Sequence, residues 1–152
     1  MIRKVVKLLL VIAWMGLIFS FSNDTGVKST KKSDGLIIKA AEVFLNRNLS
    51  DIEKDNLTKF LVVPVRKGAH LFVYSVLGIL IFSFITEFIS IGYKSLICSF
   101  IFSFLYACSD EIHQMFVSGR SGQISDVVLD TIGAGIGIIL CLFIFRRRKK
   151  YE

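Results

Sequence analysis

The chain has 152 residues, of which 53% are hydrophobic, and its mean hydropathy is +0.64. Four apolar stretches approach or reach the roughly 20 residues that cross a bilayer, which excludes an ordinary soluble domain of this length. The formal net charge of +7 comes from basic residues at the ends of these stretches and in one loop. That placement indicates contact with anionic lipid headgroups and excludes a nucleic-acid role, because no basic stripe interleaves with stacking aromatics.

The hydropathy pattern predicts an all-α, polytopic membrane protein that forms one membrane domain over residues 1–152. Its four transmembrane helices are expected at approximately residues 5–22, 67–90, 93–113 and 126–145. A basic start before an apolar run also fits a cleavable signal peptide. We favour a retained span because Trp14 and its apolar neighbours make the run longer than such a signal needs.

A polar loop with short amphipathic helices is predicted between the first two spans. Residues 23–33 are rich in Ser, Thr, Gly, Asp and Lys, which is typical of an irregular connector. Apolar residues then recur at helical spacing over residues 36–45, which predicts a short helix on the membrane surface or across the end of the bundle. Ser50 and Glu53 have the spacing of a capping box for a second short helix. Pro64 is expected to end that helix or to start the next.

Four spans place both termini on one side of the membrane. Three of the first seven residues and five of the last seven are basic, so the positive-inside rule puts both termini on the cytoplasmic side of the membrane. The loop between the first two spans opposes this orientation, because residues 28–67 hold nine Lys and Arg. We keep the orientation in which this loop is extracytoplasmic.

One consequence holds in either orientation, because the second span enters from the loop side, the third returns to it and the fourth leaves from it. A cluster of polar residues therefore gathers at that membrane face. The members are Arg66, Lys67, His70, Tyr74, Asp110, Glu111, His113, Gln114, Arg120, Asp126 and Asp130. Charges inside a span are costly and usually face the bundle interior, so we expect a functional site, with structural ion pairs alone as the alternative.

Three chemistries could use this cluster. A metal site is disfavoured, because neither the histidines nor Cys98, Cys108 and Cys141 have metal-ligand spacing, and we expect neither a metal nor another cofactor. Asp110 and His113 are one helical turn apart and are the candidates for acid–base catalysis, although no nucleophile is evident. Binding of an anionic group by Arg66, Lys67 and Arg120 is favoured, since arginine suits phosphate and carboxylate.

Three blocks in this cluster have a distinctive order and spacing. They are RKGAH at residues 66–70, DEIHQ at 110–114 followed by Gly119 and Arg120, and Asp126-Val127 followed by TIG at 131–133. In this combination the chain resembles the VanZ-like family of bacterial integral membrane proteins, over most of its length. The sequence departs from the family at Asp130, where asparagine is common, and this extra carboxylate is expected to change the charge of the site.

The resemblance implies a protein of the bacterial cell envelope, and the family's best-known member is associated with low-level resistance to teicoplanin, a glycopeptide antibiotic. We expect this protein to bind or exclude a lipid-linked cell-wall intermediate or a lipoglycopeptide at the outer leaflet. Two alternatives remain open at this stage. One is an intramembrane enzyme that acts on an envelope lipid, and the other is a structural partner of a larger envelope complex. Membrane lipids are partners in each case.

Overall fold

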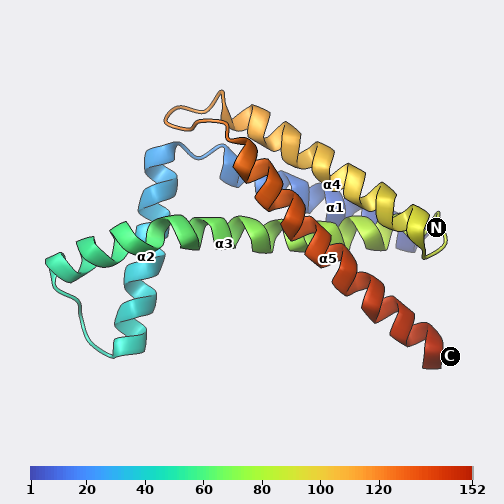
Figure 1. The fold of residues 1–152 in the computed structure, drawn as a ribbon, viewed down its shortest axis with the longest axis horizontal. Helices are drawn as coiled ribbons and strands as arrows, with labels where there is room; N and C mark the ends of the chain where they lie inside the picture. The colour runs from blue at the N-terminus through green and yellow to red at the C-terminus, as the bar shows by residue number, and fades with distance from the viewer. Residues whose placement is uncertain (152) are drawn as a thin grey trace.

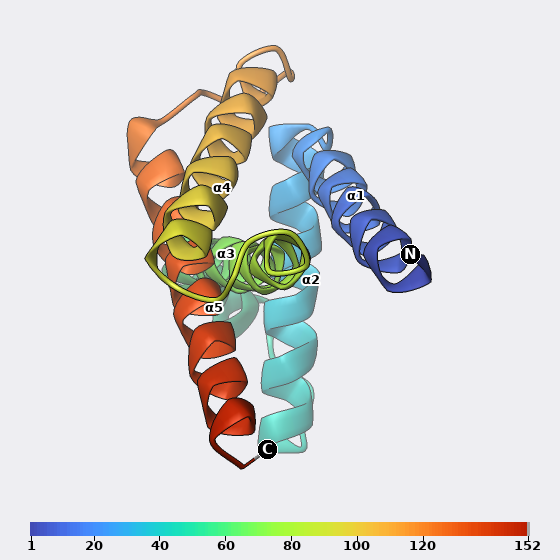
Figure 2. The same cartoon turned by 90° about the vertical axis from the view of Figure 1, so that its right-hand side faces the viewer.

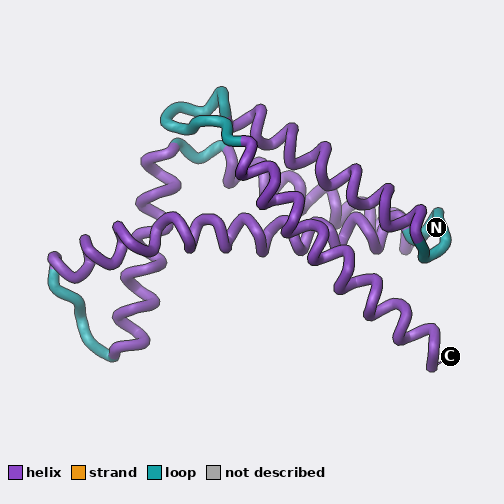
Figure 3. Tube along the Cα trace, viewed as in Figure 1, coloured by secondary structure: helices purple, strands orange, loops and turns teal. Residues whose placement is uncertain are grey.

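The computed structural model describes the backbone of residues 1–151 and the side chains of residues 1–147. The described chain is helical and contains no strand (Figures 1 and 3). The helices are α1 (Ile2–Ser22), α2 (Gly26–Leu45), α3 (Asp51–Ile85), α4 (Tyr93–Gln114) and α5 (Ile124–Tyr151). Four of them, α1, α3, α4 and α5, are long and apolar enough to cross a membrane. The prediction of an all-α polytopic fold with four spans is therefore confirmed.

The central helix of the bundle is α3, which packs against every other helix and most extensively against α5. Figure 2, which looks along α3, shows α4 and α5 on one side of it and α1 on the other. Both termini lie at one end of the bundle (Figure 1). Many large apolar side chains on the outer faces are exposed, such as Leu9, Phe102 and Phe143, as expected for helices that contact lipid.

Close contact between α3 and α5 depends on glycine. A Cβ atom at Gly133 would lie 2.6 Å from the carbonyl oxygen of Leu71, and one at Gly137 would overlap the carbonyl of Ser75. The Ser75 hydroxyl donates a hydrogen bond of 2.8 Å to the Gly133 carbonyl oxygen across this interface. Small residues let two helix backbones approach closely in a bilayer, where packing and such hydrogen bonds drive helix association. This contact sets the distance between the polar residues of the two helices.

The loop between the first two spans is more helical than the sequence suggested. The irregular connector expected over residues 23–33 is wrong, because α2 begins at Gly26, where the Thr25 hydroxyl caps the helix by accepting from the amide of Lys28 at 3.4 Å. The Thr30 and Ser33 hydroxyls bond back to carbonyls one turn earlier, so residues that often mark a loop are accommodated within the helix. Figure 1 shows α2 crossing α3 at a steep angle.

The second span is one helix of 35 residues rather than a short helix followed by a separate span. Its capping box is confirmed, since the Ser50 hydroxyl accepts from the amide of Glu53 and the Glu53 carboxylate accepts from the amide of Ser50 at 2.9 Å. The expected break at Pro64 is wrong, because the helix continues through this exposed residue at the loss of one backbone hydrogen bond.

The same span ends at Ile85 instead of the predicted residue 90. Hydropathy alone extended it, because residues 88–91 are mostly apolar. In the structure Glu87 turns toward α1, where it pairs with Arg3 at 2.7 Å and with Lys7 at 2.5 Å. These contacts fix the end of α3 to the start of α1.

Candidate functional site

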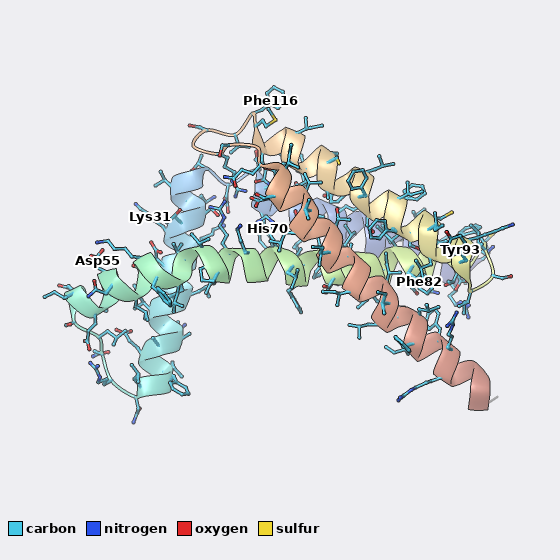
Figure 4. The ribbon with its side chains drawn as sticks, viewed as in Figure 1. Lys31, Asp55, His70, Phe82, Tyr93 and Phe116 are labelled. Atoms are coloured by element: carbon cyan, nitrogen blue, oxygen red, sulfur yellow. The ribbon has the colours of Figure 1, made fainter. Side chains whose placement is uncertain are left out.

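The predicted polar residues lie toward the end of the bundle where α2 and the loop between α4 and α5 meet α3. Figure 4 shows His70 on the side of α3 that faces this loop. The structure separates the predicted residues into a hydrogen-bonded network around Asp110, a pair formed by His70 and Asp130, and two basic side chains that contact cavities.

Asp110 on α4 is the centre of the network and is 3% exposed. Its Oδ2 atom accepts hydrogen bonds from the Ser22 hydroxyl at 2.8 Å, the Tyr74 hydroxyl at 3.1 Å and the Gln114 amide at 3.1 Å. These donors come from α1, α3 and α4, so one carboxylate oxygen joins three spans. Its Oδ1 atom is buried and has no hydrogen-bond partner among the described residues.

Arg120, in the loop between α4 and α5, extends this network to the end of α1. Its Nη1 atom donates to the Gln114 side-chain oxygen at 2.7 Å. Its Nε and Nη2 atoms donate to the carbonyl oxygens of Asp24 and Phe21 at 2.9 and 3.1 Å. Carbonyls at a helix C-terminus lack partners within the helix, and arginine satisfies them here. Burial lowers the pKa of Arg120 from its ordinary value, and the nearby charge of Arg66 adds to this effect.

Asp24, between α1 and α2, is also buried. Hydrogen bonds from Lys28 and Lys32 hold its pKa at about 2, well below its ordinary value. The Lys28 ammonium lies 2.7 Å from one carboxylate oxygen, and Lys32 binds the other. Two of the basic residues of α2 are therefore occupied by this carboxylate.

His70 and Asp130 form a separate pair between α3 and α5. The distance from His70 Nδ1 to Asp130 Oδ1 is 3.3 Å. This separation is close enough for an ion pair, although Asp130 Oδ1 makes no well-directed hydrogen bond within the described part of the chain. Asp130 is 1% exposed, whereas the His70 side chain is 24% exposed. The pair therefore joins a buried carboxylate to an imidazole that remains accessible.

No hydrogen bond or ion pair joins the predicted acid–base pair of Asp110 and His113 within the described structure. The His113 ring stacks on Phe19 with 4.3 Å between ring centroids, and its Nε2 atom is buried without a hydrogen-bond partner among the described residues. Glu111 accepts a hydrogen bond of 2.6 Å from the amide of Gln123 and thereby supports the loop before α5. The side chains of Asp110, Glu111 and His113 line neither of the two cavities at this end of the bundle.

Two cavities open beside the polar residues. The first, called the apolar cavity, has a volume of about 190 Å³ and includes the apolar residues Ile18, Phe21, Leu36, Val65 and Val73. The second, called the polar cavity, has a volume of about 410 Å³. Its polar lining residues are Thr30, Arg66, Lys67, His70, Gln123 and Asp126.

Arg66 and His70 are the described residues that line both cavities. Arg66 is half-buried, and neither it nor the exposed Lys67 has a side-chain hydrogen bond or ion pair with another residue between 1 and 147. These two basic side chains thus differ from Arg120, all of whose side-chain nitrogens donate to the protein. They remain available to an anionic group that enters either cavity.

Sequence reasoning missed three contributors to this site. Ser22, which donates to Asp110, lies at the polar end of the first span, and that position is the signal that could have identified it. Asp24 and Lys32 belong to the segment expected to be an irregular connector, and recognising the helix there would have placed Lys32 two turns after the acidic residue.

Comparison with protein families identifies the family of this chain. In the part of the chain that the structure describes, no group of three or more His, Cys, Asp or Glu side chains could hold a metal ion. Comparison with curated proteins and with solved structures found no match. The profile of the VanZ/LLP1 family matches residues 7–146, which include every residue of the predicted polar cluster. The chain is therefore a multi-pass membrane protein that belongs to the VanZ/LLP1 family.

Proposed function

We propose that this protein binds an amphiphile with an anionic headgroup at the outer leaflet of a bacterial plasma membrane. The observation that supports this most directly is Arg66, a half-buried arginine that contacts two cavities and has no partner among the described side chains. A guanidinium group held away from bulk water is stabilised by an anion, and its planar donors match phosphate or carboxylate. Lys67 would add a second positive charge.

The apolar cavity supports the amphiphilic character of this ligand. Phe21, Leu36 and Val65 line it and are also exposed on the outside of the protein, with Leu36 66% exposed. Apolar side chains in that position are compatible with an acyl or isoprenoid chain that continues into the surrounding lipid. The headgroup would then lie against Arg66, where the apolar cavity meets the polar one.

A lipid-linked cell-wall intermediate and a lipoglycopeptide both have this chemistry. A protein that binds or excludes such a ligand is expected to give low-level teicoplanin resistance. Membership of the VanZ/LLP1 family suggests this phenotype. In this proposal the single membrane domain has cytoplasmic termini, so that the cavities face the cell wall. Tyr74 and Gln114 hold the walls of the site through Asp110, and Arg120 does so through Gln114. Tyr74 and Arg120 also line the apolar cavity, although all side-chain nitrogens of Arg120 already donate to the protein.

The proposal is tested by the binding of dihexanoyl phosphatidic acid to the purified full-length protein in a neutral detergent, measured by native mass spectrometry. Arg66→Ala is expected to weaken binding by about 10-fold or more, because a hydrogen bond to a charged group contributes about 1.5–3 kcal/mol. The matched control is Arg47→Ala, which removes an exposed arginine that pairs with Glu53 near the start of α3. Equal affinity of Arg66→Ala and wild type would contradict the proposal.

A second experiment asks whether the ligand is related to glycopeptide antibiotics. Wild type, Arg66→Ala and Arg47→Ala are expressed at equal membrane levels in a sensitive Gram-positive host, and teicoplanin susceptibility is measured. Protection by wild type and Arg47→Ala, but not by Arg66→Ala, is the expected result. Anion binding without protection would retain the binding site and reject the antibiotic-related ligands.

A further inference from the structure

We propose that His70 and Asp130 form an acid–base pair that hydrolyses a phosphate ester of the amphiphile bound at Arg66. This inference rests on the proposed function, because it adds a reaction at the same site. It replaces the pair of Asp110 and His113 that the sequence suggested. The substrate class is a lipid-like phosphomonoester, and the second reactant is water.

The pair places a buried carboxylate beside one nitrogen of an accessible imidazole. Asp130 is almost fully buried, and its Oδ1 atom lies 3.3 Å from Nδ1 of His70. A carboxylate beside one ring nitrogen favours the proton on that nitrogen and leaves the other able to accept a proton. The Nε2 atom of His70 has no hydrogen-bond partner among the described residues and, unlike that of His113, is not enclosed. His70 would be the catalytic residue and Asp130 a positioning residue.

The position of His70 between the two cavities adds a second argument. The apolar cavity leads to it from the side of Phe21 and Leu36, whereas the polar cavity leads to it from the side of Gln123 and Asp126. The polar cavity is far larger than the space that one water molecule requires. An amphiphile entering from one side and water entering from the other would therefore meet at His70. Arg66, which also lines both cavities, would hold the phosphate there.

The reaction is balanced with water alone. His70 Nε2 takes a proton from a water molecule as the water oxygen forms a bond to phosphorus. The bond between phosphorus and the ester oxygen breaks on the side opposite the attacking water. The departing alcohol oxygen takes a proton from solvent water, and His70 returns its proton to water in the polar cavity. Arg66 stabilises the charge on the remaining phosphate oxygens. The charged groups near the imidazole are Asp130 on α5, Asp110 on α4 and Arg66 on α3, and Lys67 and Asp126 line the polar cavity with it.

The experiment follows the release of inorganic phosphate from dihexanoyl phosphatidic acid by the purified full-length protein. His70→Asn keeps a donor near Asp130 but removes the basic nitrogen, and it is expected to lower the rate by about 10²-fold or more. Asp130→Asn is expected to have a smaller effect and to shift the pH–rate profile, which a merely structural role would not do. His113→Asn is the matched histidine control, because that ring stacks on Phe19 outside both cavities.

Binding of a non-hydrolysable phosphonate analogue is measured on the same variants. Its affinity is expected to change less than about 3-fold in His70→Asn, so that a lost reaction is separated from lost folding or lost binding. Phosphate release by wild type and by His113→Asn, but not by His70→Asn, supports the inference. Wild type that binds phosphatidic acid and releases no phosphate would overturn it while leaving the proposed function intact. Failure of wild type to bind the analogue would reject both.

Discussion

At the scale of single residues, the polar cluster separates into side chains that hold the bundle together and side chains that remain available. Residue type and helical spacing were enough to predict which side chains would gather at one membrane face. They did not predict partners, because a partner depends on where the neighbouring helices lie. Arg120 and Arg66 are both arginines near this face and both line the apolar cavity. Arg120 donates hydrogen bonds to the end of α1, whereas the side chain of Arg66 has no hydrogen-bond partner among the described residues.

Substitution of Asp110 is expected to act mainly on stability. Asp110→Ala would leave the Tyr74 hydroxyl and the Gln114 amide buried without their acceptor, which costs about 1–3 kcal/mol for each unsatisfied group. Asp110→Asn keeps one oxygen acceptor and should cost less. Thermal unfolding in detergent checks the order, with Asp126→Ala as the control because Asp126 lies at the accessible start of α5. Equal melting of Asp110→Ala and wild type would show that the network contributes little.

At the scale of elements, hydropathy predicted the four spans. The start of α2, the continuation of α3 through Pro64 and the end of α3 were not predicted from the sequence. Thr, Ser and Gly in residues 25–33 suggested a loop, but side-chain hydrogen bonds to backbone carbonyls let them continue as a helix. Pro64 suggested a break, but a long helix with a capped start continues through it. Helix α2 is supported by its contacts with α3, and α3 continues through Pro64 because a long helix forms cooperatively. A local sequence pattern contains neither of these effects.

The contact between α3 and α5 gives a prediction at this scale. Gly137→Ala is expected to destabilise the protein by about 1–3 kcal/mol, because its Cβ would overlap the Ser75 carbonyl and force two backbones apart. Gly135→Ala is the matched control on the same helix, since its Cβ would lie 3.5 Å from Phe100, an ordinary contact. Thermal unfolding of both variants is the measurement. A Gly137 variant as stable as the Gly135 variant would show that the helices separate at little cost.

At the scale of the whole molecule, the decisive question is which side of the membrane the cavities face. Four spans put the loop between α2 and α3 and the loop between α4 and α5 at one end, and the turn between α3 and α4 with both termini at the other. A ligand derived from the cell wall can reach Arg66 only if the first end is extracytoplasmic. The basic termini favour this orientation, whereas the basic residues of α2 oppose it under the same rule.

Thiol labelling of intact cells resolves this conflict. Cys98, Cys108 and Cys141 are first replaced by alanine, and single cysteines are then introduced by Asn48→Cys, Ser121→Cys or Ser90→Cys, all at exposed loop positions. A membrane-impermeant maleimide is expected to label the first two variants and to label Ser90→Cys only after the cells are permeabilised. The reverse pattern would place the cavities on the cytoplasmic side. Because the cavities and Arg66 would be unchanged, the ligand would then have to be an anionic amphiphile of the inner leaflet rather than a cell-wall intermediate.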